Sequence, residues 1–155
     1  MDFRISGLDR DEFAPLFGLS DVQLSERGIV RRVADRQPGF PCRVSLQDAE
    51  PGETLLLLNY EHLAVASPYR ARHAIYVREN AQTAQPAVNE IPTVLRNRLL
   101  SLRAYDGAGM MVEADVVHGT DVEPVIERIL AEQNVEFIHV HNAKPGCFAA
   151  RIDRA

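Results

Sequence analysis

The chain has 155 residues, a length that suits one domain and buries about 68–70% of the surface that its unfolded form exposes. Its composition, 46% hydrophobic and 25% charged, excludes a fully disordered, collagenous or coiled-coil protein. The net charge is −5, from 17 basic and 22 acidic residues, so the chain has no electrostatic footprint for nucleic acid.

Targeting and redox signals are few. Met1 to Ser6 has no basic region followed by an apolar stretch, as a signal peptide would have. The longest aliphatic run, Leu55 to Leu58, is too short to cross a membrane. Two cysteines, Cys42 and Cys147, do not make a disulfide framework. We expect a soluble, cytoplasmic single domain over residues 1–155 with reduced thiols, and neither nucleic acid nor a membrane as its partner.

Alternating or unbroken apolar runs predict about seven or eight strands. Eight of them come, in chain order, from residues 3–8, 42–46, 53–60, 74–78, 99–105, 110–117, 136–142 and 147–152, and residues 29–33 are a further candidate segment. The leucine run at 55–58 is apolar on both faces, which is typical of a central strand. Glycine-containing loops at 106–109 and 143–146 predict two antiparallel hairpins.

The clearest helix runs from Val122 to Leu130, because its apolar residues recur at helical spacing behind a capping box at Thr120 and Glu123. A short helix capped by Asp9 and a helical turn near 93–97 are also expected. The predicted fold class is α+β, a curved and mainly antiparallel sheet with about two helices, of which the Val122 to Leu130 helix packs on one face.

Gly-rich phosphate loops, the G-x-S-x-G elbow, H-E-x-x-H and C-x-x-C are all absent from the sequence. Four other segments together resemble a family of small bacterial proteins, domain of unknown function number 1203. These segments are 41–46 (PCRVSL), 67–70 (SPYR), 102–105 (LRAY) and 139–147 (HVHNAKPGC). The resemblance covers nearly the whole chain and implies a stand-alone bacterial domain without an established activity.

His139 and His141 stand two apart in a predicted strand, so both side chains point to one face. Cys147 joins that face if it opposes residue 141 in the terminal hairpin, and lies on the face of Val140 if it opposes residue 142. The first register places four apolar residues together on the core side, namely Ile138, Val140, Phe148 and Ile152. We therefore predict that Cys147 faces the two histidines.

Three interpretations of this face remain open. A zinc site would use His139, His141 and Cys147, with Cys42 or water as the fourth ligand. A nucleophilic Cys147 would be activated by His141. The third and favoured interpretation is structural: buried cysteines and histidines that bond to loop backbone, since free cysteine is among the most buried residue types.

Arginines supply a further candidate site, because the guanidinium fork binds carboxylate and phosphate groups bidentately. Arg43, Arg70 and Arg103, with Tyr69, are predicted to converge on an anionic ligand. Glu61 and His62 end the buried strand and are a weaker candidate.

We therefore predict that the protein binds a small anionic molecule in an arginine-lined pocket. The alternative is a thiol- or zinc-dependent enzyme centred on His139, His141 and Cys147. Both enzymatic activity and a homodimer stay open, and no cofactor besides optional zinc is expected.

Overall fold

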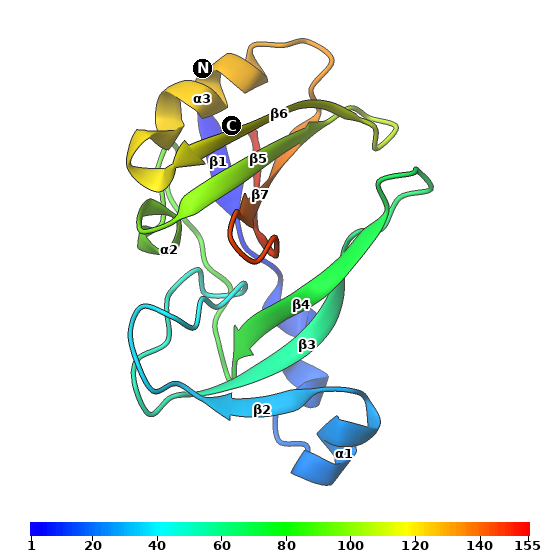
Figure 1. The fold of residues 1–155 in the computed structure, drawn as a ribbon, viewed down its shortest axis with the longest axis vertical. Coiled ribbons are helices and arrows are strands. Elements are labelled where there is room, and N and C mark those ends of the chain that lie inside the picture. Colours follow the sequence, from blue (N-terminus) through cyan, green and yellow to red (C-terminus); the bar gives the residue numbers. More distant parts are fainter.

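The computed structural model describes all 155 residues, which form two antiparallel sheets (Figure 1). The five-stranded sheet has the order β1-β8-β7-β5-β6, from β1 (Phe3–Ser6), β5 (Leu99–Tyr105), β6 (Met111–His118), β7 (Phe137–Asn142) and β8 (Phe148–Arg154). The three-stranded sheet has the order β2-β3-β4, from β2 (Val30–Val33), β3 (Thr54–Leu63) and β4 (Ala71–Arg78).

Three short α-helices and three 3₁₀ turns complete the fold. The helices are α1 (Asp21–Glu26), α2 (Thr93–Arg96) and α3 (Val122–Leu130), and the turns are η1 (Arg10–Glu12), η2 (Ala14–Leu16) and η3 (Gly119–Asp121). No helix is both long enough and apolar enough to span a membrane.

The predicted α+β class is confirmed, but the single curved sheet is corrected to two sheets. β4 and β5 are not neighbours, because the irregular connection over residues 79–92 carries the chain from one sheet to the other. In Figure 1 the two sheets occupy opposite ends of the long axis. Their facing sides meet at the side chains of β3, β7 and β8 described below.

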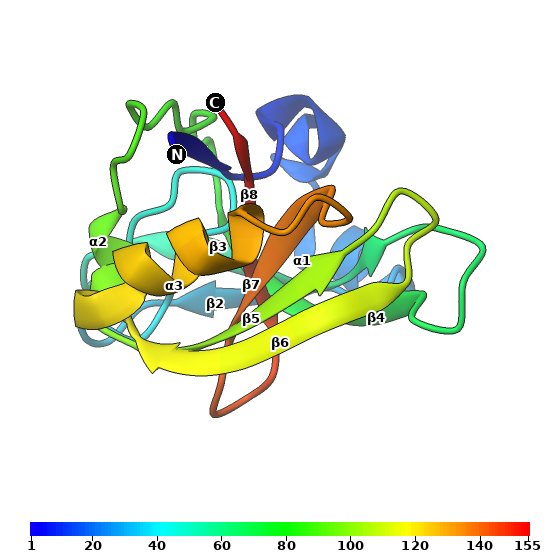
Figure 2. The ribbon, with the colours of Figure 1, turned by 90° about the horizontal axis from the view of Figure 1, so that it is seen from above.

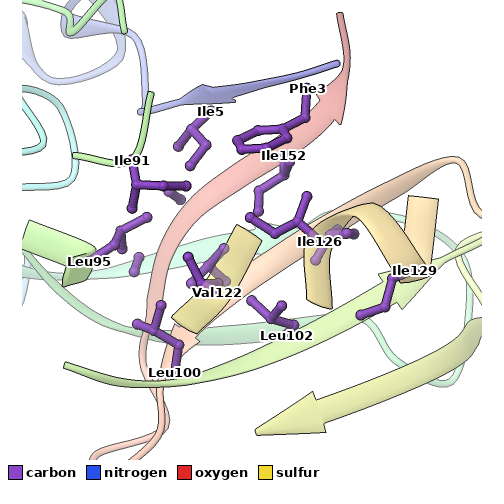
Figure 3. Packing of buried hydrophobic residues seen from close by; sticks show 14 of the residues in the cluster. Phe3, Ile5, Ile91, Leu95, Leu100, Leu102, Val122, Ile126, Ile129 and Ile152 are labelled. Carbon is purple, nitrogen blue, oxygen red and sulfur yellow. The ribbon is translucent and has the colours of Figure 1, made fainter. Parts of the chain in front are cut away.

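Helix α3 covers one face of the larger sheet, as its apolar spacing predicts (Figure 2). Val122, Ile126, Ile129 and Leu130 are buried, and they pack against Leu102 and other side chains of the sheet (Figure 3). This layer is hydrocarbon throughout. Burial of such a layer supplies most of the stabilisation available to a domain of this size.

The leucine run forms the central strand of the smaller sheet, since β3 lies between β2 and β4. Leu56 and Leu58 pack with Phe13 and Leu24, so η1, η2 and α1 cover this side of the sheet. The predicted central position of residues 55–58 is therefore confirmed.

One helix was not predicted, and one predicted strand was wrong. Helix α1 was missed, although Ser20 and Gln23 form a complete capping box at its start. The segment 42–46, predicted as a strand, is a turn with isolated bridges only. The Leu46 amide donates to the Cys42 carbonyl, and Leu46 has a φ of 53°, which ends an extended ladder.

Candidate functional site

The terminal hairpin decides which side chains can meet. Ile138 opposes Ile152 and Val140 opposes Ala150, but His141 opposes Phe148, so Ala149 is an extra residue in a β-bulge. Beyond the bulge, the Asn142 amide donates to the Cys147 carbonyl at 2.9 Å. The bulge therefore brings Phe148 onto the histidine face and turns Cys147 to the other face. The faces predicted for Phe148 and Cys147 are therefore wrong, because the alternation of apolar and polar residues in a sequence does not reveal a β-bulge.

Three imidazoles meet where the two sheets face each other. His139 and His141 project from β7, and His62 projects from the end of β3. One ring nitrogen of each lies within 4.8 Å of the other two. The ring centroid of His62 is 4.9 Å from that of His141 and 5.8 Å from that of His139. We call these three residues the histidine cluster.

Aromatic rings enclose the histidine cluster. Phe148 stacks on His62 at 5.5 Å with 7° between the ring planes, and its centroid is 4.9 Å from that of His139. Tyr105 and Phe137 also contact the His139 ring, at centroid distances of 5.5 and 5.0 Å. The imidazoles therefore lie in a largely apolar pocket.

Hydrogen bonding leaves the cluster with free nitrogens. His141 Nδ1 lies 2.9 Å from the Gly146 carbonyl oxygen, so Nδ1 carries the proton and Nε2 is left as an acceptor. That Nε2 is buried without a hydrogen-bond partner, and so are Nδ1 of His62 and Nδ1 of His139. Unpartnered buried polar atoms are rare in native structures, so three such ring nitrogens in one cluster require an explanation.

The cluster is uncharged at neutral pH. Burial lowers the pKa of His62 to about 4 and the pKa values of His139 and His141 to about 3. The positive charge of Arg103 lowers all three further, and no carboxylate opposes these shifts. Neutral imidazole is the form that ligates metal ions. The cluster residues are therefore the ones that could hold a metal.

On the other face of the hairpin, Cys147 contacts Arg43 and no imidazole. Arg43 Nη2 donates to Cys147 Sγ at 2.8 Å, and its Nε and Nη1 donate to the carbonyl oxygens of Phe148 and Pro41 at 2.7 and 2.6 Å. Arg43 is only 2% exposed, and burial lowers its pKa. No carboxylate pairs with this buried guanidinium.

A cavity of about 910 Å³ opens beside this contact. Four cationic side chains line it, and no Asp or Glu does. The cations are Arg36, Arg43, Arg98 and Lys144, and Cys147, Asn142, His73 and His118 also reach it. We call it the basic cavity.

The other predicted ligand-binding residues lie elsewhere. Arg70 pairs with Glu61 at 2.9 Å, and Arg103 Nε donates to Ser101 Oγ at 3.2 Å beside the histidine cluster. Tyr69 is 38% exposed and packs edge-on against Tyr105. Of the predicted set, only Arg43 lines the basic cavity.

The predicted four-residue zinc set is not assembled. Cys42 Sγ accepts hydrogen bonds from the amides of Ser45 and Arg78, at 3.4 and 3.3 Å. Cys147 Sγ contacts Arg43, so only His139 and His141 of that set share a site. The predicted pair of His141 and Cys147 is likewise split between the two faces of the hairpin.

The sequence indicated His62 only as a weaker candidate, and gave no role to Arg98 or Lys144. His62 stands at a strand end next to an irregularity in the β3–β4 register, between Tyr60 and Leu63. Its position at the end of a buried strand was the only signal. Nothing local in the sequence says that this strand end faces β7.

Fold and site together define a class: an α+β protein of two facing antiparallel sheets, with a histidine cluster between β3 and β7 and a basic cavity beside the tip of the last hairpin. The sequence profile described as "Protein of unknown function (DUF1203)" matches residues 39–154, and the chain belongs to this family. The matched region includes His62, Arg43 and the whole terminal hairpin. Searches of curated proteins and of solved structures found no match.

Proposed function

We propose that the protein binds a small organic anion in the basic cavity. The observation that carries this proposal is the lining, which combines four cationic side chains with no acidic one. A concave site that presents charges of one sign attracts ligands of the opposite sign, because its low-dielectric walls concentrate the field.

Two of the four cations lack a carboxylate partner. Arg98 is neutralised by Asp48 through two contacts of 2.6 and 3.0 Å, and Arg36 pairs with Asp35 at 3.2 Å. Arg43 and Lys144 form no ion pair. The cavity therefore holds an excess of about two positive charges, which suits a carboxylate or a phosphate group.

Part of the remaining wall is apolar, beside the polar side chains of His73, Asn97, His118 and Asn142. Leu57, Tyr76 and Leu99 line the cavity together with several prolines and alanines. Its volume, about 910 Å³, lies within the range of about 300–1,000 Å³ that is usual for small-molecule sites. A ligand with one anionic end and a compact hydrocarbon or aromatic body would match both parts of the lining.

The enzyme alternative keeps one supporting observation. Cys147 lines the same cavity, where its sulfur accepts a hydrogen bond of 2.8 Å from the Arg43 guanidinium, so its thiol is placed beside any bound ligand. In a bacterial cytoplasm, the compartment that we propose, this thiol would stay reduced. An anion bound in the cavity would then shield Cys147 from alkylation by iodoacetamide.

Calorimetric titration with phenyl phosphate tests the proposal, and phenol serves as the uncharged control probe. Phenyl phosphate should bind, phenol should not, and Lys144→Gln should weaken the affinity by about tenfold or more through loss of one charge-assisted contact. Arg32→Gln is the matched control, because Arg32 is an exposed arginine of β2 that does not line the cavity. Equal weakening in both variants, or no binding of phenyl phosphate, would contradict anion binding in this cavity.

A further inference from the structure

We propose that His62, His139 and His141 form a binding site for a divalent transition metal ion, zinc in the first place, with one coordination position left open. The inference is independent of the anion proposal, since none of the three histidines lines the basic cavity.

The distances suit a single ion. Tetrahedral zinc with Zn–N bonds of about 2.0–2.1 Å holds its nitrogen ligands about 3.3 Å apart. One nitrogen of each histidine already lies within 4.8 Å of the other two. Binding of one ion would therefore require the nitrogens to approach one another by up to about 1.5 Å.

The hydrogen-bonding state of the cluster points to an electrophile. Nε2 of His141 must be an acceptor because Nδ1 of the same ring donates to the Gly146 carbonyl oxygen. It has no donor, and neither His62 Nδ1 nor His139 Nδ1 has a partner. A metal ion bound through these nitrogens would accept their lone pairs and so give each of them a partner.

The surroundings of the cluster also match those of metal-binding histidines. Such histidines usually donate their second ring N–H to a carbonyl or carboxylate oxygen, which fixes the ring orientation, and His141 does so to Gly146. Phe148 stacks against His62 and restricts water on that side. An apolar shell around a site limits solvent access to the metal and modifies its chemistry.

The donor set selects the metal and its fourth ligand. Three imidazoles without a carboxylate suit zinc, copper, nickel or iron rather than magnesium or calcium. The cluster supplies no negative charge, and Arg103 contributes a positive one nearby. The open position would therefore take hydroxide or a small anion. Three protein ligands with one open position is the arrangement of catalytic rather than structural zinc sites.

Zinc titration of chelator-treated protein, followed by calorimetry and elemental analysis, tests the site. One zinc ion per chain should bind, and His62→Gln, His139→Ala and His141→Ala should each weaken binding by more than about 100-fold. His118→Ala is the matched control, because His118 is an exposed histidine of β6 outside the cluster and should leave zinc binding unchanged. His62→Gln decides the question if the variants in β7 do not fold, since His62 is the least buried of the three.

Cobalt(II) gives a second readout of the same ligands. The cobalt protein should show the intense visible absorption of tetrahedral coordination and no near-ultraviolet band of a thiolate ligand. Cys147→Ala should leave that spectrum unchanged, because Cys147 faces Arg43. The proposal is overturned if neither zinc nor cobalt binds at one ion per chain, if His62→Gln binds zinc as tightly as the native chain, or if a thiolate band is present and disappears in Cys147→Ala.

Discussion

Strand β7 is buried along its whole length, yet its two faces differ in kind. Ile138 and Val140 point into the hydrocarbon layer under α3, whereas His139 and His141 point toward β3. All four side chains are at most 3% exposed. The difference shows that burial alone does not separate core from site.

The two faces of β7 differ in whether their buried side chains carry polar atoms without hydrogen-bond partners. On the α3 face of β7 the buried side chains, Ile138 and Val140, carry no polar atoms. Burial of that face therefore stabilises the fold directly. The β3 face buries ring nitrogens that lack partners, which costs free energy that the fold does not recover by itself. A buried arrangement that lowers stability is more readily explained by function than by packing.

The largest expected effect is a pH dependence of the free energy of unfolding that comes from the histidine face of β7 and not from the α3 face. In the unfolded chain the three imidazoles titrate near 6.5, while in the folded chain burial lowers the pKa of His62 to about 4 and those of His139 and His141 to about 3. The unfolded state therefore binds more protons below pH 6.5, so the stability contributed by these groups is complete above pH 6.5 and is lost as pH falls toward 3.

Between about pH 6 and pH 4, His139 and His141 each remove at most about 1.4 kcal/mol per pH unit, and the half-buried His62 removes less because solvent screens it, so the three together remove about 3–4 kcal/mol per unit at most. Urea unfolding of metal-free protein between pH 7 and pH 5 measures this slope. In His139→Phe it should fall by about one third. A free energy of unfolding that stays flat from pH 6.5 to 5 would show that the cluster is protonated or solvated in the folded chain.

The second prediction concerns the α3 face. Ile126 is fully buried in the hydrocarbon layer, so Ile126→Ala should destabilise the fold by about 2–5 kcal/mol at pH 7 through lost burial and a residual cavity. Urea unfolding checks it, with Glu127→Ala on the exposed side of the helix as control. A loss below about 0.5 kcal/mol would place Ile126 outside the core.

A smaller effect is expected where one imidazole is hydrogen-bonded. His141→Phe keeps an aromatic ring against Phe148 but leaves the Gly146 carbonyl oxygen without its donor. The expected cost is about 1 kcal/mol, the usual value of one such hydrogen bond. The change should appear in the free energy of unfolding of metal-free protein at pH 7. An unchanged value would mean that water replaces the imidazole donor without loss.

The smallest effect is expected at the neighbouring histidine of the same face. His139 Nδ1 has no partner, and its ring is surrounded by Tyr105, Phe137 and Phe148. His139→Phe should therefore change the free energy of unfolding at pH 7 by less than about 0.5 kcal/mol, or raise it, because a buried unpaired acceptor is removed. Thermal unfolding of metal-free protein measures this. A loss comparable with that of Ile126→Ala would remove the distinction between the two faces.

Local patterns in the sequence predicted the elements that local interactions decide. Helix α3 followed from its apolar spacing, and the hairpins of β5–β6 and β7–β8 followed from alternation around glycine-containing loops. The predicted pairing of His139 and His141 on one face needed only the period of two in a strand.

The rest depends on contacts between distant segments. That β4 does not join β5 in one sheet, and that His62 meets β7, are results of packing two sheets together, which no short pattern encodes. The position of Cys147 depends on a single extra residue, Ala149. Alternation correctly placed Ile138 and Ile152 on one face, but the predicted register did not pair them, and past the bulge it gave the wrong face for Cys147 and Phe148.

The same bulge indicates where the family can vary in length. Ala149 is the one residue of β8 between two ladder segments that already have partners, Ala150 with Val140 and Phe148 with His141. Loss of Ala149 would join these segments into a regular ladder and keep both pairings, whereas loss of Phe148 would put Ala149 opposite His141 and remove the ring that stacks on His62. Relatives that lack one residue in β8 should therefore have lost it at this alanine, with the histidine cluster intact.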